Sequence, residues 1–288
     1  MFKLLALVSI ALLAPGQCFF GGPAANARIS QGPKSAEAVV DKLLSPQNKA
    51  KTMVVLGTYA ADFNAIEYGQ RLRHYLPELK SKGVKKIAMV LNAEESSCEA
   101  FRDILNLPPE IELLADPLGE TGRKYGVSRG LLPDVNLNPF LKLYIMLFGA
   151  GAPNTLPAVI TGYLGNPNGE SGWITSSLAQ GQIAGRWPNN ALKIDDSGNV
   201  ETNFFAELPV VGSWGRRPLE LATLRLQNMI GVSLNRWEDL APKEASLQAG
   251  VLTQLGGCIV VSNGERVYER MDDGICSIAD FEEILRAL

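Results

Sequence analysis

The stretches TMVVLG at residues 52–57 and DFNAIEYGQRLRHYLPELKSKG at residues 62–83 decide the fold. The first is short and apolar, which predicts a buried strand, and the second has apolar residues at helical spacing, which predicts a helix that packs on a sheet. The connection between them reads Thr58-Tyr59-Ala60-Ala61. A dinucleotide-binding turn needs glycines here so that the backbone can approach a phosphate. Because the connection has none after Gly57, the sequence argues against such a site.

Alternating strands and helices continue on both sides of this unit. The continuous apolar run KKIAMVL is typical of a parallel strand that is buried on both faces. The connections are short, and this order of elements predicts a parallel α/β sheet. The further elements expected in this half are a lead-in helix at 34–44, a strand at 85–91, a helix at 96–105 with Ser96 as its N-cap, a strand at 111–115 and a brief helix at 119–126.

The C-terminal end of the chain predicts a β-hairpin followed by a closing helix. Strands at 256–261 and 265–270 flank Asn263-Gly264, a dipeptide that tolerates positive φ at both central positions of a hairpin turn. Residues 278–288 then place apolar side chains on one helix face. The expected fold is therefore an α/β sheet of parallel strands and a hairpin, with helices on both faces.

A long insertion separates the two halves of this sheet. Its apolar segments 139–149 and 155–164 predict two helices, each too short to cross a membrane. Residues 165–215 are rich in Gly, Asn and Ser and predict an irregular ordered lobe, and residues 218–230 predict a helix that begins at a proline. The expected organisation is 34–126 for the N-terminal half of the sheet domain, 127–251 for a mainly helical insertion, and 252–288 for the hairpin and last helix.

The N-terminus has the pattern of a targeting sequence. Lys3 and the following apolar run predict a signal peptide at residues 1–18, with cleavage before Phe19. Residues 19–33 are rich in Gly, Ala and Pro and contain Arg28 but no acid, so they resemble the transit segment of the bipartite presequences found in algae with complex plastids. We expect a plastid (chloroplast) location, and plain secretion with a disordered start is the alternative.

Composition limits the classes of function. The chain has 27 Lys and Arg against 30 Asp and Glu and no basic block, so nucleic-acid binding has no electrostatic support. His74 is the one histidine, which argues against a Cys/His zinc cluster. Three cysteines remain after the signal peptide, too few and too irregularly spaced for a disulfide framework. We therefore expect no metal, no cofactor and no nucleic-acid partner.

Several segments carry a family resemblance. They are DFNAIEY at 62–68, the stretch from LPPE at 107–110 to Asp116-Pro117, RPLELATLRL at 217–226, and the hairpin from Thr253 onward. On these segments the chain resembles the AhpC/TSA-type peroxiredoxin-like (peroxiredoxin-like 2) proteins of the thioredoxin-like superfamily, and most of all their cyanobacterial and plastid members. The resemblance covers most of residues 50–288. It implies a thioredoxin-like sheet that is interrupted by the large insertion before the C-terminal hairpin.

The resemblance also locates the usual reactive site. Animal relatives carry Cys-x-x-Cys after the first strand, a motif that maps onto about Tyr59 to Asp62, where this chain has no cysteine. Thr58, Tyr59 and Asp62 thus form a degenerate active-site loop. Cys98 is the remaining catalytic candidate, because it lies in the first turn of its predicted helix, where backbone N–H groups and the helix dipole stabilise a thiolate. The neighbouring acids Glu94, Glu95 and Glu99 act against that thiolate.

The other candidate side chains lie in the second half of the chain. Cys258 is predicted to be buried in a strand, and a disulfide with Cys276 is conceivable. Arg217 and Arg225 are candidates for contact with an anion or a partner. An internal ion pair, for Arg217 with Glu220, is the alternative.

Two functions are consistent with this sequence. The first is a plastid thioredoxin-fold protein with a non-catalytic, partner-binding role, which contacts a thylakoid membrane protein complex through the apolar residues 139–164. The second is a thiol-dependent antioxidant peroxidase or reductase that uses Cys98, with Cys258 or Cys276 as resolving thiol and thioredoxin as a partner. A lipid- or prostanoid-type reductase, as some relatives are, would need the same missing thiols. Whether the chain is an enzyme, and its oligomeric state, are left open by the sequence.

Overall fold

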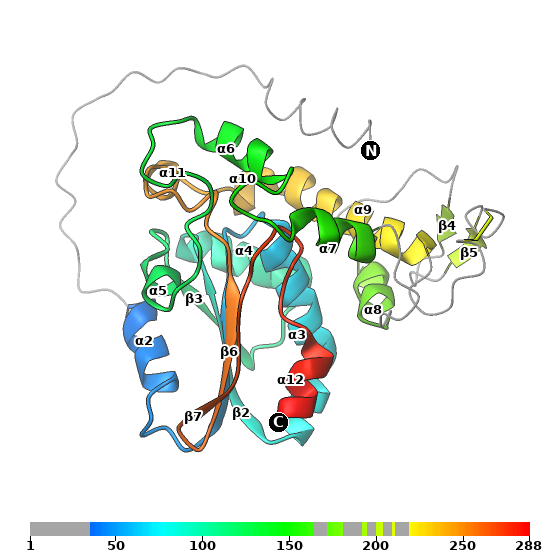
Figure 1. The fold of residues 1–288 in the computed structure, drawn as a ribbon. Coiled ribbons are helices and arrows are strands. Elements are labelled where there is room, and N and C mark those ends of the chain that lie inside the picture. The colour runs from blue at the N-terminus through cyan, green and yellow to red at the C-terminus, as the bar shows by residue number, and fades with distance from the viewer. Residues whose placement is uncertain (1–34, 164–171, 181–191, 195–199, 204–208, 211–218) are drawn as a thin grey trace.

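The computed structural model describes residues 35–163, 172–180, 192–194, 200–203, 209–210 and 219–288 (Figure 1). The predicted signal peptide at 1–18, the transit-like segment at 19–33 and Arg217 lie outside the described residues.

A five-stranded sheet with strand order β3-β2-β1-β6-β7 forms the centre of the protein. Strands β1, β2 and β3 are parallel, while β6 pairs antiparallel with β1 and β7 pairs antiparallel with β6. This is the thioredoxin-like arrangement that the sequence predicts. The strand bounds are Lys51–Leu56 for β1, Val84–Leu91 for β2, Ile111–Ala115 for β3, Gly257–Ser262 for β6 and Glu265–Met271 for β7.

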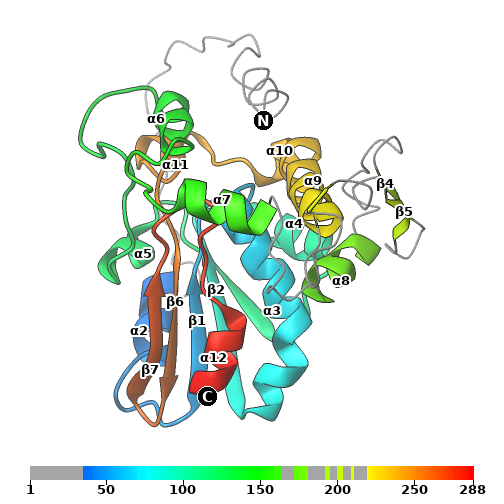
Figure 2. The ribbon, with the colours of Figure 1, turned by 45° about the vertical axis from the view of Figure 1, so that its right-hand side comes forward.

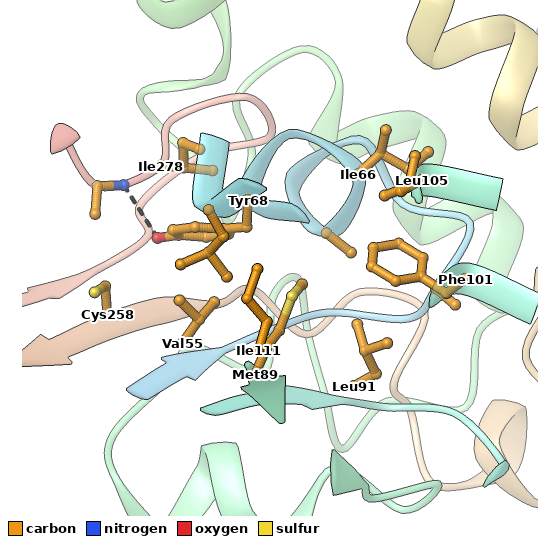
Figure 3. Close-up of a cluster of buried hydrophobic side chains, with 14 of the residues drawn as sticks. Val55, Ile66, Tyr68, Met89, Leu91, Phe101, Leu105, Ile111, Cys258 and Ile278 are labelled. Atoms are coloured by element: carbon orange, nitrogen blue, oxygen red, sulfur yellow. Dashed lines mark hydrogen bonds between the residues drawn. The ribbon is translucent and has the colours of Figure 1, made fainter. Parts of the chain in front are cut away.

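Helices cover both faces of the sheet (Figures 1 and 2). One face packs against α3 (Phe63–Ser81), α4 (Glu95–Leu105) and α12 (Phe281–Ala287), and the other against α2 (Ala36–Leu43) and α5 (Glu120–Lys124). Figure 3 shows the larger of the two cores, where strand residues meet helix residues. Its labelled members include Val55, Met89, Leu91, Ile111 and Cys258 from the strands, with Ile66, Tyr68, Phe101 and Leu105 from α3 and α4.

The predicted hairpin turn is confirmed. Asn263 and Gly264 have φ angles of 55° and 85°, the left-handed values that a two-residue hairpin turn of this type requires. Glycine has a second reason to stand here, because a Cβ atom at position 264 would lie 2.1 Å from the carbonyl oxygen of Pro46. The turn therefore also packs against the loop that precedes β1.

The insertion contains several short helices and one small sheet. The predicted helices at 139–149, 155–164 and 218–230 are present, and the last of them is longer than predicted. The expectation of an irregular lobe is wrong for three of its segments, which form a helix and two paired strands. The bounds are α6 Pro139–Met146, α7 Thr155–Tyr163, α8 Gly172–Gln180, β4 Leu192–Ile194, β5 Val200–Asn203, α9 Leu219–Asn235, α10 Trp237–Leu240 and α11 Glu244–Gln248.

Helices α6, α7, α9, α10 and α11 lie together over the end of the sheet at which β1 and β2 finish (Figures 1 and 2). This placement matters because loops at the carboxyl ends of parallel strands are where α/β folds usually hold their functional side chains. Within the described part of the chain, no helix combines the length and the apolar character needed to cross a bilayer.

Candidate functional site

The loop of residues 58–62 joins the carboxyl end of β1 to the first turn of α3. Its backbone is a tight turn, in which the Asp62 N–H donates to the Tyr59 carbonyl at 2.9 Å. The Thr58 carbonyl accepts a hydrogen bond of 3.0 Å from the Asn92 N–H, which continues the pairing of β1 with β2 beyond the strands. Asp62 is the N-cap residue of α3, with φ −77° and ψ 147°. The loop thus stands at the helix N-terminus where the resemblance places the family's thiols.

The insertion covers this loop. Tyr59 is only 6% exposed, and Ala60 is fully buried. The Tyr59 ring meets the edge of the Trp237 ring of α10, with centroids 6.4 Å apart and planes at 81°. A second contact fixes α10 to the sheet domain, because the Ser97 hydroxyl of α4 donates to the Asp239 carbonyl at 2.7 Å. The loop is therefore buried, and α10 contacts it through the ring of Trp237.

Two polar side chains of the loop bind each other. The Thr58 hydroxyl donates to Oδ2 of Asp62 at 2.6 Å. Burial raises the pKa of Asp62 to about 6, although the Thr58 hydroxyl and the nearby backbone amides of Phe63 and Asn64 act in the opposite direction. Burial and then the Asp62 charge raise the pKa of Tyr59 well above its ordinary value. The loop therefore holds a carboxyl group that titrates near neutrality, and no nucleophilic thiol.

A second buried carboxyl group, Asp272, lies directly after β7. It accepts a hydrogen bond of 2.7 Å from the Tyr68 hydroxyl and one of 3.1 Å from the Asn64 amide. Burial raises the pKa of Asp272 to about 8, and the hydrogen bonds from Tyr68 and Asn64 oppose that rise. The Tyr68 hydroxyl also accepts from the Ala279 N–H at 3.0 Å, the dashed line in Figure 3. Sequence reasoning missed this network, since its only signal was an acid that follows a strand.

Cys98 stands two positions later in its helix than predicted. The N-cap of α4 is Glu94 rather than Ser96, so Cys98 is the fourth residue of the helix. The thiol is buried and borders a pocket of about 330 Å³ that α4, β3 and the start of α2 enclose. Burial raises the pKa of Cys98 to about 12, and the charges of Glu95 and Glu94 add to the effect. The thiol is therefore protonated at neutral pH, in the direction that the neighbouring acids predict.

Cys98 and Cys258 lie on different elements, α4 and β6. Cys258 is fully buried in β6, whereas the pocket beside Cys98 is lined by β3. The two strands are three positions apart in the sheet, roughly 14 Å at the usual strand spacing. Cys258 and Cys276 do not form a disulfide. Burial raises the pKa of the Cys258 thiol as well.

Arg225, a candidate for contact with an anion or a partner, lies inside the protein. The side chain is buried and forms an ion pair with Glu67 of α3. Its other guanidinium nitrogen, Nη1, donates to the Gly162 carbonyl at 3.1 Å. The guanidinium carbon also lies 5.2 Å from the centroid of the Trp173 ring. Arg225 therefore joins α9 to α3 inside the protein, because a buried charge needs an opposite charge beside it.

Glu67 is shared between two arginines. Arg71, one helical turn away on α3, approaches Oε1 of Glu67 at 2.7 Å and stacks on Trp173 from a centroid distance of 4.7 Å. A hydrogen bond of 2.5 Å between Gln70 and Asn228 joins the same two helices. Among the residues that the structure describes, no group of three or more His, Cys, Asp and Glu side chains is placed to hold a metal ion.

One comparison identifies relatives of the chain. Residues 71–274, well over half of its length, match the family model described as AhpC/TSA antioxidant enzyme. The matched range begins after the loop of residues 58–62, so the match does not extend to that loop. A search of curated proteins and a search of solved structures each found no match.

Proposed function

The chain belongs to the AhpC/TSA antioxidant enzyme family, and from that premise we propose that it is a member whose usual thiol loop has no redox chemistry. In this proposal the protein keeps the thioredoxin fold and acts by binding a partner. The observation that carries the proposal is the state of the loop: it has no cysteine, and Trp237 closes over Tyr59. Reduction of a hydroperoxide needs a thiolate that the substrate can reach. The loop provides neither a thiolate nor access for the substrate.

The experiment is a hydroperoxide-reduction assay on the purified protein, with thioredoxin as electron donor. We expect turnover no faster than that of buffer with the same reductant. The Cys98→Ser variant serves as the matched control, because it removes the thiol that borders the pocket of α4 and β3. Turnover by the wild-type protein that disappears in Cys98→Ser would contradict the proposal.

Turnover that depends on Cys98 would indicate the second candidate function, a thiol-dependent peroxidase or reductase based on Cys98 with thioredoxin as partner. The pocket of about 330 Å³ beside the thiol favours it, since a small substrate fits such a volume. The raised pKa of Cys98 weighs against it, because the protonated thiol is a poor nucleophile. We therefore rank it second.

We further propose that the protein is related to the cyanobacterial and plastid peroxiredoxin-like 2 proteins and works in the plastid, at the thylakoid membrane and its protein complexes. The support is the RPLELATLRL segment at 217–226, together with the apolar run and acid-free stretch at residues 1–33. A fluorescent fusion to residues 1–40, expressed in an alga with complex plastids, tests the location. Fluorescence in the plastid is expected, and fluorescence in the medium would support secretion instead.

A further inference from the structure

Exposed apolar side chains are concentrated on one part of the insertion. Among the described residues, most of the large apolar side chains that face solvent lie in the loop before α6, on α6 itself, in the connection to α7 and on α7. We call this set the apolar surface: Leu132, Val135, Leu141, Phe148, Leu156 and Ile160. Phe148 is 54% exposed and Ile160 is 57% exposed. Soluble proteins rarely leave such groups in water without a use for them.

Part of this set lies on one face of α7. Leu156 and Ile160 are four residues apart on that helix, which is the spacing of one helix face. Phe148 lies in the turn that follows α6. The Tyr144 ring, half-buried on α6, meets the edge of the Phe148 ring at a centroid distance of 5.3 Å. Both helices lie at the end of the molecule beyond the sheet (Figures 1 and 2).

Electric charge is almost absent from this region. Between residues 135 and 163 the sequence has no Asp, Glu, Arg or His, and its one lysine is Lys142. That lysine is buried, and its Nζ donates to the Leu132 carbonyl at 2.7 Å. The nearest exposed acid, Asp134, forms an ion pair of 2.9 Å with Arg129. The apolar surface therefore presents no exposed cation to an anionic partner.

Most polar side chains in the same region are hydrogen-bonded within the protein. Asn138 caps α6 by accepting from the Phe140 and Leu141 amides at 2.9 and 3.2 Å. The Thr161 hydroxyl donates to the Pro157 carbonyl of its own helix at 2.9 Å. Pro139 and Pro157 remove two N–H groups that the first turns of α6 and α7 would otherwise leave open.

The base of α7 is fixed to the sheet domain by polar contacts. Asn154 binds Asp273 through its backbone N–H at 3.1 Å and through its side-chain amide at 2.5 Å. The Thr155 hydroxyl accepts from the Ile275 N–H at 3.0 Å. The start of α7 is therefore held in place. These contacts engage the polar groups of Asn154 and Thr155 within the protein.

These observations favour one kind of partner over another. A protein interface takes about one hydrogen bond per 100–200 Å² and has a polar rim, which needs side chains that are still available for bonding. A bilayer requires the opposite, that polar groups already be bonded internally. We propose that the apolar surface inserts into the boundary between headgroups and acyl chains of a lipid bilayer. Because the surface exposes no cation, the lipids are electrically neutral ones.

This proposal deepens the proposed function, in which the protein acts through a surface rather than a thiol. Lipid binding and peroxide turnover are separate measurements, so either can fail alone. The test is flotation with vesicles of phosphatidylcholine, alone or mixed with phosphatidylglycerol, at low and high salt. Both the full chain and a chain that begins at Lys34 are used, so that binding by the apolar residues 4–14 is recognised.

The informative variants are Phe148→Asp and Ile160→Asp. The control is Val267→Asp, an exposed apolar position on β7 (38% exposed) that lies outside the apolar surface. We expect flotation of the wild-type chain and the control with neutral vesicles, unchanged by salt. Each surface variant should partition roughly tenfold less or weaker still, because it loses the burial of one large apolar side chain. Urea unfolding midpoints equal to the wild type show that the variants are folded.

Three results would overturn the proposal. The first is no flotation of the wild-type chain with any vesicle. The second is flotation that needs phosphatidylglycerol and disappears in salt, since that would indicate electrostatic attraction. The third is a wild-type dimer in lipid-free solution that Phe148→Asp dissociates without any effect on flotation, which would assign the surface to a second copy of the chain.

Discussion

The indole ring of Trp237 stands edge-on against the phenol ring of Tyr59, with centroids 6.4 Å apart. The two residues come from different parts of the fold, α10 of the insertion and the loop after β1. An edge-to-face contact of this kind contributes about 0.5–1.5 kcal/mol beyond the burial of the rings. This contact places the insertion against the loop, so the chemistry of the loop depends on the insertion.

Restoring a cysteine to the loop is therefore not expected to restore reactivity. In Ala60→Cys the new thiol occupies a fully buried position next to Tyr59, where reagents have no access and burial keeps it protonated. We expect the number of thiols that react with a disulfide reagent to stay at the wild-type value in the folded protein, and to rise by one in urea.

The second variant, Ala60→Cys with Trp237→Ala, removes the covering ring. Its added thiol should react in the folded state, and Trp237→Ala alone provides the background for the original cysteines. Rapid reaction of Ala60→Cys with Trp237 intact would show that the loop is open to solvent, contrary to the structure.

Cys98 should be a slow nucleophile. With its pKa raised to about 12 from an ordinary value of 9.0, the fraction present as thiolate at pH 8 is roughly a thousandfold smaller than for an unperturbed thiol. Alkylation followed by mass spectrometry of the modified peptide measures this rate, and a short unstructured cysteine peptide is the reference. A rate equal to that of the peptide would mean that the pocket stabilises the thiolate.

Stability should fall as the pH rises from 7 to 8, because of Asp272. Its carboxyl group has a pKa of about 8 when folded against 3.8 ordinarily, so in this range the folded protein holds a proton that the unfolded chain has released. The free energy of unfolding should therefore decrease by at most about 1.4 kcal/mol per pH unit. Burial lowers the pKa of His74 from its ordinary value of 6.5. The protonation of His74 therefore affects stability only at lower pH.

Urea denaturation across this pH range checks the prediction, with Asp272→Asn as the diagnostic variant. The asparagine keeps an oxygen for the Tyr68 hydroxyl but has no proton to lose, so its stability should be flat from pH 7 to 8. Asp62→Asn is the control, since the pKa of Asp62 is about 6 and its contribution is nearly complete by pH 7. An unchanged slope in Asp272→Asn would refute the assignment.

Removal of Glu67 should destabilise the protein more than removal of Arg225. Glu67→Gln leaves Arg225 buried without its carboxylate, and breaking a buried ion pair in this way costs about 3–5 kcal/mol. In Arg225→Met, Glu67 still has Arg71 at 2.7 Å, so the loss should be smaller.

A double-mutant cycle measures the coupling. The double variant should be less destabilised than the sum of the two single variants, since each single change already removes the pair. Additive losses in urea unfolding would mean that the two side chains act independently.

The sequence was sufficient for the sheet and its helices because their signals are local. The apolar run of β2, the Asn263-Gly264 turn and the helical spacing in α3 each lie within a few residues of one another. The effect of Glu94 and Glu95 on Cys98 was predictable for the same reason, since the neighbours are adjacent in sequence.

The covering of the loop and the burial of Arg225 could not be read in this way. Helices α10 and α11 have four and five residues, too few for a periodic pattern to be recognised. Arg225 lies next to Leu226 in an apolar helix, but its burial is possible only because Glu67 comes to it from a distant part of the chain. The pKa of Asp272 likewise arises from tertiary burial and not from its neighbours in sequence.

The bond between Glu67 and Arg225 also has a consequence for how the molecule can be dissected. A shortened gene that joins residue 126 directly to residue 252 would retain the whole five-stranded sheet yet remove Arg225, one of the two arginines that pair with Glu67 on α3. The sheet domain and the insertion should therefore unfold in a single cooperative transition, and neither of them is expected to fold on its own.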